Sequence, residues 1–296
     1  MVEFVNNHIL PALVLGCVYT LGAIAVSLIF SILRFAHFAH GDMMTIGGYF
    51  AFAIVTAFGL PPLAALPFAA IGTIGVALAI DRWAYKPFRR AKPIIVVIAS
   101  FGIALVIRSA VQLIWGVQAQ TYAAGVQQPM EVFAPIRLFE RHLYIVATAV
   151  VLVVALHLFL TRTKIGKAMR AMSDDADLAR VTGIDTERVV MWTWAIGATL
   201  ACAAGVLIGM DTQLTPLVGW DLLLPIFAAA ILGGLGRPYG AILGGLVIGA
   251  LEELSTYPWI GEEPLLSPGY KQAAAFLVMI AILIWRPQGI LRGKVL

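Results

Sequence analysis

The sequence has few charged residues. Aspartate, glutamate, lysine and arginine make up 12% of its 296 residues, whereas soluble domains carry about 25%. So few charges cannot solvate a whole molecular surface, and much of that surface must therefore face lipid. The scarcity of charge excludes an ordinary soluble domain and predicts a membrane protein.

Cysteine is also scarce. Cys17 and Cys202 are the only two, and both lie inside apolar runs. That setting is typical of small core side chains rather than of a disulfide or a metal site. We therefore expect these two residues to form no disulfide, and we expect no bound metal.

Nucleotide-binding and hydrolytic motifs are missing too. The sequence contains no G-x-x-x-x-G-K-[S/T] loop, and the pair Gly166-Lys167 is followed by alanine rather than by serine or threonine. It also contains no H-E-x-x-H and no G-x-S-x-G. These absences predict a chain that is not an enzyme and has no ATP or magnesium site of its own. If ATP drives its activity, another chain must hold the nucleotide.

Apolar residues, in contrast, make up 61% of the chain and form long runs. A helix of roughly 18 or more apolar residues can cross about 30 Å of hydrocarbon. We therefore expect an all-α fold, a polytopic transmembrane helical bundle of eight or nine membrane segments, in one transmembrane domain over residues 1–296. The expected segments are residues 9–33, 43–58, 63–80, 94–114, 143–160, 189–210, 222–235, 239–251 and 272–285.

The segments at 222–235 and 239–251 are short for a full crossing, and Gly236-Arg237-Pro238 separates them. We therefore expect a re-entrant or broken helix near 222–251, which leaves the number of crossings open. Glycines at four-residue spacing in this region predict close helix packing, and sliding of that contact during gating is the alternative. They are Gly236, Gly240 and Gly244 in one series, and Gly245 and Gly249 in another.

The loops alternate in charge along the chain. Basic residues concentrate at 34, 82–92, 162–188, 237 and 286–294, and the loops at 59–62, 115–142, 211–221 and 252–271 lack this excess. Because basic loops mark the cytoplasmic side, we expect the N-terminus in the periplasm and the C-terminus in the cytoplasm. The net charge of +4 then reflects topology at a lipid surface, and it does not indicate nucleic-acid binding.

One long polar stretch, Thr161–Arg188, interrupts the apolar segments. Ser173 is a favourable helix N-cap, acidic residues fill the turn after it, and Gly183 suits the position after a helix end. This pattern predicts a short helix of about nine residues outside the bilayer, with the face-forming spacing of i, i+3 and i+4. One face of this helix carries Leu178, Val181 and Thr182. It suits docking into a groove of a partner, and an ordinary surface helix is the alternative.

Three stretches share features with one known family. They read RFAHFAHGDMMTIGGYFAF at 34–52, RTKIGKAMRAMSDDADLARVTGID at 162–185 and AAAILGGLGRPYGAILGGLVIGALEEL at 228–254. In turn, they resemble the asparagine-phenylalanine-alanine-histidine-glycine-acid motif, the cytoplasmic coupling loop and the glycine-rich late segment of permease subunits of branched-chain amino acid ABC importers. Phe38 and Arg237 depart from that pattern, since family members usually have asparagine and a small residue at these places.

The resemblance implies a subunit of an uptake system in the bacterial inner membrane. A periplasmic solute-binding protein would deliver the amino acid, and this chain with a second related permease subunit would form the path. Two cytoplasmic ABC ATPase subunits, which bind ATP and magnesium, would drive alternating access. The short helix would be a coupling helix seated in an ATPase cleft. The residues expected at that contact are Met172, Ser173, Asp174, Asp175, Leu178, Ala179, Val181, Thr182, Gly183 and Ile184.

Three polar residues are candidates for the translocation path or gate. His40 and Asp42 belong to the first family-like stretch, and Arg108 lies inside an apolar segment. A central arginine costs roughly 2.5–3.5 kcal/mol to insert, so Arg108 pairs with a carboxylate such as Asp42, lines a water-filled path, or snorkels to the interface near Trp115. His37 is expected to be a plain interfacial residue.

Two other functions are alternatives. An importer for urea, short amides or another small solute would share the same architecture. A secondary transporter would show inverted repeats and buried ionisable relays, whereas this sequence has no clear repeat and few charges in its apolar segments. An ABC permease for branched-chain or related amino acids is therefore the leading interpretation.

Overall fold

The computed structural model describes residues 2–89, 91–122, 138–259, 265–286 and 288–291; parts of the predicted loops at 82–92, 115–142, 252–271 and 286–294 lie outside these ranges. The described chain is helical, and an isolated bridge between extended residues joins Gln120 and Leu214. The elements are α1 (Val2–Phe4), η1 (Val5–Ile9), α2 (Leu10–Leu33), α3 (His40–Phe58), α4 (Pro62–Ile80), η2 (Asp81–Tyr85), η3 (Lys86–Phe88), α5 (Pro93–Trp115), α6 (Glu140–Arg162), α7 (Lys164–Asp174), α8 (Ala176–Val181), α9 (Thr186–Asp211), α10 (Val218–Gly233), α11 (Pro238–Leu254), η5 (Pro268–Tyr270) and α12 (Lys271–Trp285).

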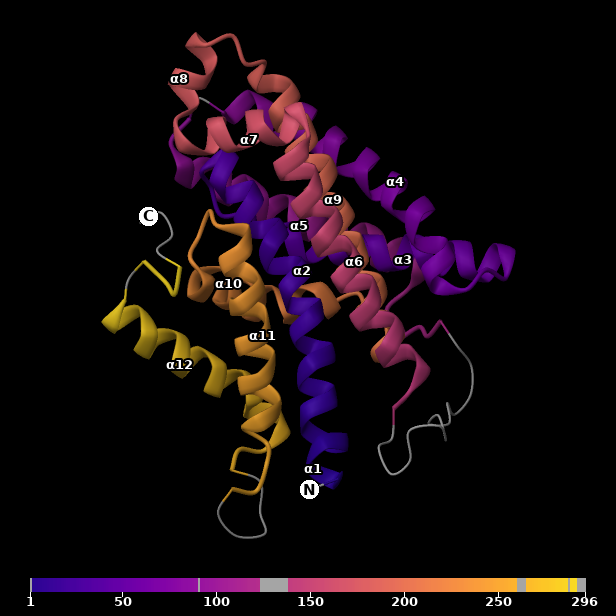
Figure 1. Ribbon diagram of the computed structural model, residues 1–296. Coiled ribbons are helices and arrows are strands. Elements are labelled where there is room, and N and C mark those ends of the chain that lie inside the picture. The colour runs from indigo at the N-terminus through magenta and orange to yellow at the C-terminus, as the bar shows by residue number, and fades with distance from the viewer. Residues whose placement is uncertain (1, 90, 123–137, 260–264, 287, 292–296) are drawn as a thin grey trace.

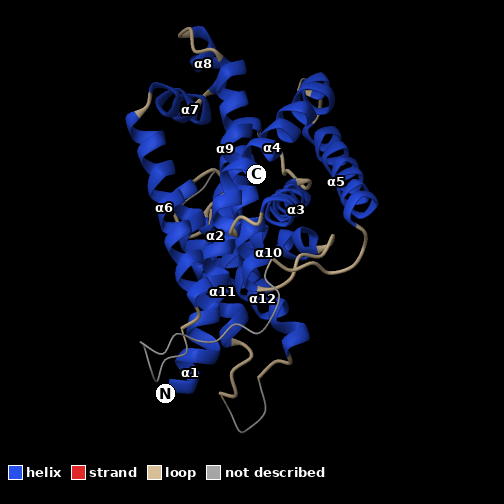
Figure 2. Cartoon of the chain, turned by 90° about the vertical axis from the view of Figure 1, so that its right-hand side faces the viewer, coloured by secondary structure: helices blue, strands red, loops and turns tan. Residues whose placement is uncertain are grey.

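Six helical stretches of the described chain are long and apolar enough to cross a membrane. They contain α2, α3, α4, α5, α6 and α9, and each coincides with one of the first six predicted segments. Shorter apolar helices, α10 and α12, match two of the later segments. The predicted polytopic helical membrane bundle is therefore confirmed (Figure 2).

Helix α2 forms the centre of the bundle. Its residues from Gly16 to Ile32 are all buried, because α9, α10 and α11 pack around it and α6 adds a further contact. Helices α4, α5 and α6 instead turn apolar side chains outward, and Leu113 and Ile114 on α5 are 87% and 66% exposed. Such continuous apolar exposure suits a surface that faces lipid.

Helices α10 and α11 form a hairpin at the predicted break. Pro238 is the first residue of α11, where its missing N–H leaves no gap in the helix. Gly236 therefore lies in the turn before the helix, with φ of 80°, and the prediction that it belongs to the same helix-packing series as Gly240 and Gly244 is wrong. The remaining glycines contact Gly233 (from Gly240), Ala229 (from Gly244), Thr20 (from Gly245) and Gly16 (from Gly249). Helix α11 thus fits closely between α10 and α2 because its residues at both contacts are glycines, which have no side chain.

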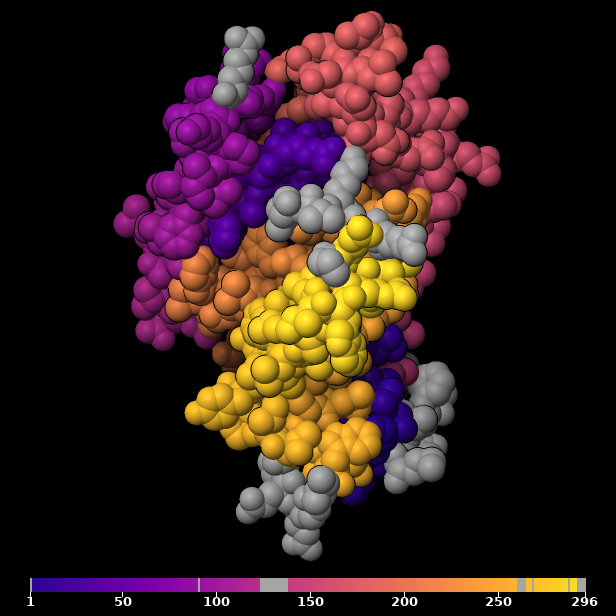
Figure 3. All heavy atoms as spheres, turned by 90° about the vertical axis from the view of Figure 1, so that its left-hand side faces the viewer, coloured from indigo at the N-terminus to yellow at the C-terminus, as the bar shows by residue number. Residues whose placement is uncertain are grey.

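The polar stretch lies at one end of the molecule. Helices α7 and α8 project at the end opposite the N-terminus, while α2 runs between the two ends (Figures 1 and 2). In the space-filling view, indigo atoms of α2 are visible between the coral atoms of α7 and α8 and the purple atoms of the region around residues 80–100 (Figure 3). This end collects the basic loops at 34 and 162–188 and the described part of the loop at 82–92.

Candidate functional site

Helix α7 is fixed firmly to the bundle. The Thr163 hydroxyl accepts a hydrogen bond from the Gly166 N–H at 2.9 Å and caps the helix. Gly166 lies against the backbone of Phe159 and Leu160, where a Cβ would have no room. The side chains of Met169 and Met172 are buried on the inner face of α7. The start of the polar stretch therefore continues α6 with only a sharp bend at Thr163.

Helix α8 begins at a cap different from the predicted one. The Asp175 carboxylate accepts hydrogen bonds from the N–H groups of Asp177 and Leu178 at 3.0 and 2.9 Å. Ser173 is not the N-cap, because α7 continues through it to Asp174. Burial of Met172 stabilises that last turn of α7, and the chain leaves helical geometry only at Asp175. The helix consequently has six residues instead of the expected nine or so.

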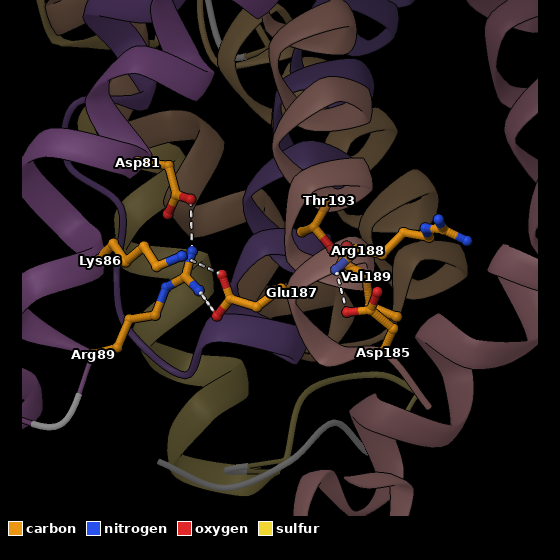
Figure 4. Close-up of polar contacts among 8 residues, drawn as sticks. All are labelled: Asp81, Lys86, Arg89, Asp185, Glu187, Arg188, Val189 and Thr193. Carbon is orange, nitrogen blue, oxygen red and sulfur yellow. Dashed lines mark hydrogen bonds and ion pairs between the residues drawn. The ribbon is translucent and has the colours of Figure 1, made fainter. Parts of the chain in front are cut away.

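The end of α8 matches the predicted glycine position. Gly183 has φ of 87°, its N–H donates to the Arg180 carbonyl at 3.1 Å, and the Ile184 N–H donates to the Ala179 carbonyl at 3.0 Å. This pair of bonds is a Schellman motif. Two residues later the Asp185 carboxylate caps α9 by accepting from the Arg188 N–H at 3.1 Å (Figure 4). Helix α8 is thereby defined sharply at both ends.

Helix α8 presents two apolar side chains outward. Leu178 is 61% exposed and Val181 is 84% exposed, and Thr182 on the same face is exposed as well. Two members of the predicted contact set, Met172 and Ala179, are buried and support the helix from below. The other members are exposed or half-buried: Ser173, Asp174, Asp175, Leu178, Val181, Thr182, Gly183 and Ile184.

A cluster of charges links two transmembrane helices (Figure 4), and it lines one cavity together with residues of α8. Arg89 donates to Asp81 at 2.6 Å and to Glu187 at 2.5 Å, and Lys86 donates to Glu187 at 2.8 Å. These bonds join the end of α4, through η2 and η3, to the first turn of α9. Sequence reasoning missed this cluster, although Asp81 and Glu187 are the acids that flank two basic loops.

A cavity of about 330 Å³ lies between this charge cluster and helices α7 and α8. Its lining includes Met172, Ala176 and Arg180. Leu33, Arg34 and Phe35, where α2 ends, also line it. Space therefore remains between α8 and the bundle beneath it.

Asp42 and Arg108 are brought together in the interior. The Arg108 guanidinium donates through Nε and Nη2 to the two carboxylate oxygens of Asp42, at 3.0 and 3.1 Å. The Asp42 side chain is fully buried, and that of Arg108 is 14% exposed. Trp220 covers the guanidinium, with its ring centre 4.6 Å from Cζ. Of the three alternatives for Arg108, the structure shows the pairing with a carboxylate. A role in translocation stays a prediction. The contact with Trp220 was not predicted from the sequence.

His37 and His40 are both buried, at 2% and 1% exposure. The expectation that His37 is an interfacial residue is therefore wrong. After Arg34 the chain turns back into the protein, and the His37 ring lies edge-on to Trp194 with centres 4.9 Å apart. Trp194 in turn stacks on Tyr85 at 5.2 Å. His40 begins α3 inside this packed region rather than at a membrane surface.

The opposite end of the molecule has its own hollow of about 800 Å³, lined by the starts of α4 and α6 and the end of α9. At its rim Asp211 pairs with Arg141 and His142 at 3.6 and 3.5 Å. Within the described residues no group of three or more histidine, cysteine, aspartate or glutamate side chains is placed to hold a metal ion. Cys17 and Cys202 are both free thiols in the interior.

Comparison with known proteins adds three findings. The family model for the permease component of the branched-chain amino acid transport system matches residues 8–283. The high-affinity branched-chain amino acid transport permease LivH of Escherichia coli K12 is 34% identical over 94% of this chain and 92% of its own length. The corresponding permease BraD of Pseudomonas aeruginosa is 31% identical over 96% and 95%.

One solved structure shares the fold. PsaBC from Streptococcus pneumoniae in complex with Fab superimposes with a TM-score of 0.51, covering 94% of this chain and 93% of the matched chain. The two sequences are 15% identical, so this similarity concerns architecture alone.

Proposed function

The chain belongs to the family of branched-chain amino acid transport permeases, and we propose that it forms, with a second related permease subunit, the path of an ATP-driven importer for branched-chain amino acids. The observation that carries this proposal is similarity over almost the whole chain, residues 8–283, combined with a helical membrane bundle from which a capped helix projects at one end.

The energy source would be two separate ABC ATPase subunits. The sequence has no phosphate-binding G-x-x-x-x-G-K-[S/T] loop, so ATP and magnesium would bind to those partners. A periplasmic solute-binding protein would supply the amino acid. The basic loops gathered near α7 and α8 favour a cytoplasmic position for that end, which would place the N-terminus in the periplasm of a bacterial inner-membrane protein.

Helix α8 is the part of the chain best suited to contact an ATPase. Leu178 and Val181 offer exposed apolar surface on a helix whose two ends are capped. Docking of this face into an ATPase cleft would bury both side chains. Met172 and Ala179, which are buried, would act by holding α8 in place rather than by touching the partner.

The Asp42–Arg108 pair and His40 would belong to the gated interior. Asp42 and His40 lie in the first turn of α3, and Arg108 lies on α5. Because the pair joins two helices, alternating access would require α3 and α5 either to move together or to exchange this pairing. The different affinity of the two states for the amino acid would then give direction to transport.

Reconstitution into liposomes tests the proposal. The chain is co-expressed with its second permease and ATPases, leucine-loaded binding protein is added, and leucine uptake is measured with and without ATP. The L178D variant, with aspartate on the exposed apolar face, is expected to lose ATPase co-purification and uptake. L178M keeps apolar contact and is expected to retain both. Full leucine uptake without any ATPase would refute the proposal.

A further inference from the structure

Arg34 has an unusual backbone conformation for its side chain. It ends α2 with φ of 59° and ψ of 32°, and it is the only residue other than glycine with positive φ in the described chain. Glycine adopts this left-handed region without penalty, whereas a side chain with a Cβ is disfavoured there. An arginine at this place therefore calls for a compensating interaction of its side chain.

The Arg34 side chain makes that interaction with the end of α7. The Arg34 guanidinium donates through Nη2 to the Ser173 carbonyl oxygen at 2.7 Å. Ser173 lies in the last turn of α7, directly before the break at Asp175. Carbonyls in a last turn lack intrahelical donors, and the negative end of the helix dipole attracts a cation. The contact thus joins the end of α2 to the hinge between α7 and α8.

The residues after Arg34 connect this contact to the interior. Phe35 and Ala39 are buried, and the Ala39 N–H donates to the Ser100 hydroxyl of α5 at 3.0 Å. Three residues beyond Ala39, Asp42 pairs with Arg108, which is also on α5. A displacement of Arg34 would therefore act on a packed segment that is bonded to α5 at two points.

Arg34 also lines the cavity beneath α8. Met172 lines the same cavity of about 330 Å³, and α8 packs mainly against α7 and α9, so the hydrogen bond from Arg34 is a direct polar link between the end of α2 and the end of α7. We propose that Arg34 is a positioning residue that transmits movement of the α7–α8 hinge to the α2–α3 junction. This inference rests on the proposed function of α8, and it adds the residue through which that function reaches the gate.

The local conformation supplies a selective test. R34G removes the side-chain link but suits the backbone geometry, so the variant is expected to fold and to assemble with its ATPases as the wild type does. Transport per ATP hydrolysed, measured in liposomes with loaded binding protein, is expected to fall on the order of tenfold, the factor that loss of one charge-assisted hydrogen bond implies. R34K, which keeps one donor, is expected to recover part of the ratio.

Controls separate the possible outcomes. R82A removes another exposed cytoplasmic-end arginine and is expected to leave transport per ATP unchanged. If R34G keeps the wild-type ratio, or loses transport and ATP hydrolysis only in proportion to the amount of assembled complex, Arg34 is not a coupling residue. If the wild type itself shows no ATP-dependent uptake, the proposed function fails instead, and the two failures are thereby distinguished.

Discussion

Gly41 and Gly219 meet backbone to backbone where α3 and α10 begin. A Cβ on either residue would collide with the carbonyl of the other. The Thr45 hydroxyl completes the contact by accepting a hydrogen bond from the Gly219 N–H at 3.0 Å. Two helix starts that lie 178 residues apart (219 minus 41) are therefore held together by the absence of side chains.

The G219A variant is expected to lose stability by about 1–3 kcal/mol, the usual effect of overpacking a close contact. The control is G102A, since Gly102 lies inside α5 with nothing within 4 Å of a new Cβ. It is expected to be neutral or stabilising by up to about 1 kcal/mol, because alanine favours a helix. Thermal unfolding of the purified complex in detergent measures both. Equal melting temperatures for the two variants would contradict the contact.

The D42N variant is expected to lower stability by about 3–5 kcal/mol, because it leaves the guanidinium of Arg108 in the interior without a counter-charge. The double variant D42N/R108Q removes the uncompensated charge and is expected to be more stable than D42N alone. Unfolding of wild type, D42N, R108Q and the double variant gives the coupling energy between the two positions. Additive effects in this cycle would show that the two side chains do not interact.

The D175A variant is expected to destabilise α8 by about 1 kcal/mol through loss of its N-cap. The D175S variant keeps a side-chain acceptor and is expected to remain close to wild type. Hydrogen exchange at the amides of Asp177 and Leu178 reports the effect directly, since both donate to the Asp175 carboxylate. The S173A variant distinguishes the two possible N-caps. Faster hydrogen exchange at these amides in S173A than in D175A would show that Ser173, as predicted from the sequence, is the N-cap.

The charge cluster at the same end contains acids in two environments. The Glu187 side chain is 58% exposed and that of Asp81 is 12% exposed. E187Q is therefore expected to change stability by at most about 1 kcal/mol, and the effect should shrink at high salt. D81N is expected to cost about 2 kcal/mol, because the charge-assisted bond that it removes lies at the more buried carboxylate. A larger loss in E187Q than in D81N would reverse this assignment.

Much of the fold was predictable because the apolar runs are long. A helix that crosses a membrane must satisfy its own backbone, so segments such as 94–114 and 189–210 had one available structure. The pairing of Asp42 with Arg108 was also accessible, since few interior charges can compensate an arginine. Residues whose role depends on contacts distant in sequence were not: Trp220 covers Arg108 from α10, and no local pattern near it indicates this.

Two predictions failed for the same physical reason. Ser173 and Asp175 are both good N-caps, and the choice between them depends on burial of Met172 beneath α7. His37 follows a basic residue and was therefore expected at a membrane surface, but the chain folds back so that its ring lies on Trp194. In both places tertiary packing overrides a sound local signal.

Helix α2 is synthesised long before α11, the helix that covers its small-residue face. Thr20 donates to the Ile242 carbonyl at 3.2 Å, and Gly16 receives the close approach of Gly249. Membrane insertion of α2 must therefore precede its enclosure by the time needed to synthesise more than 200 residues (238 minus 33 gives 205). Throughout that interval Thr20 and the glycines on this face lack their native partners on α11. A substitution on this face is therefore expected to act first during membrane insertion and folding.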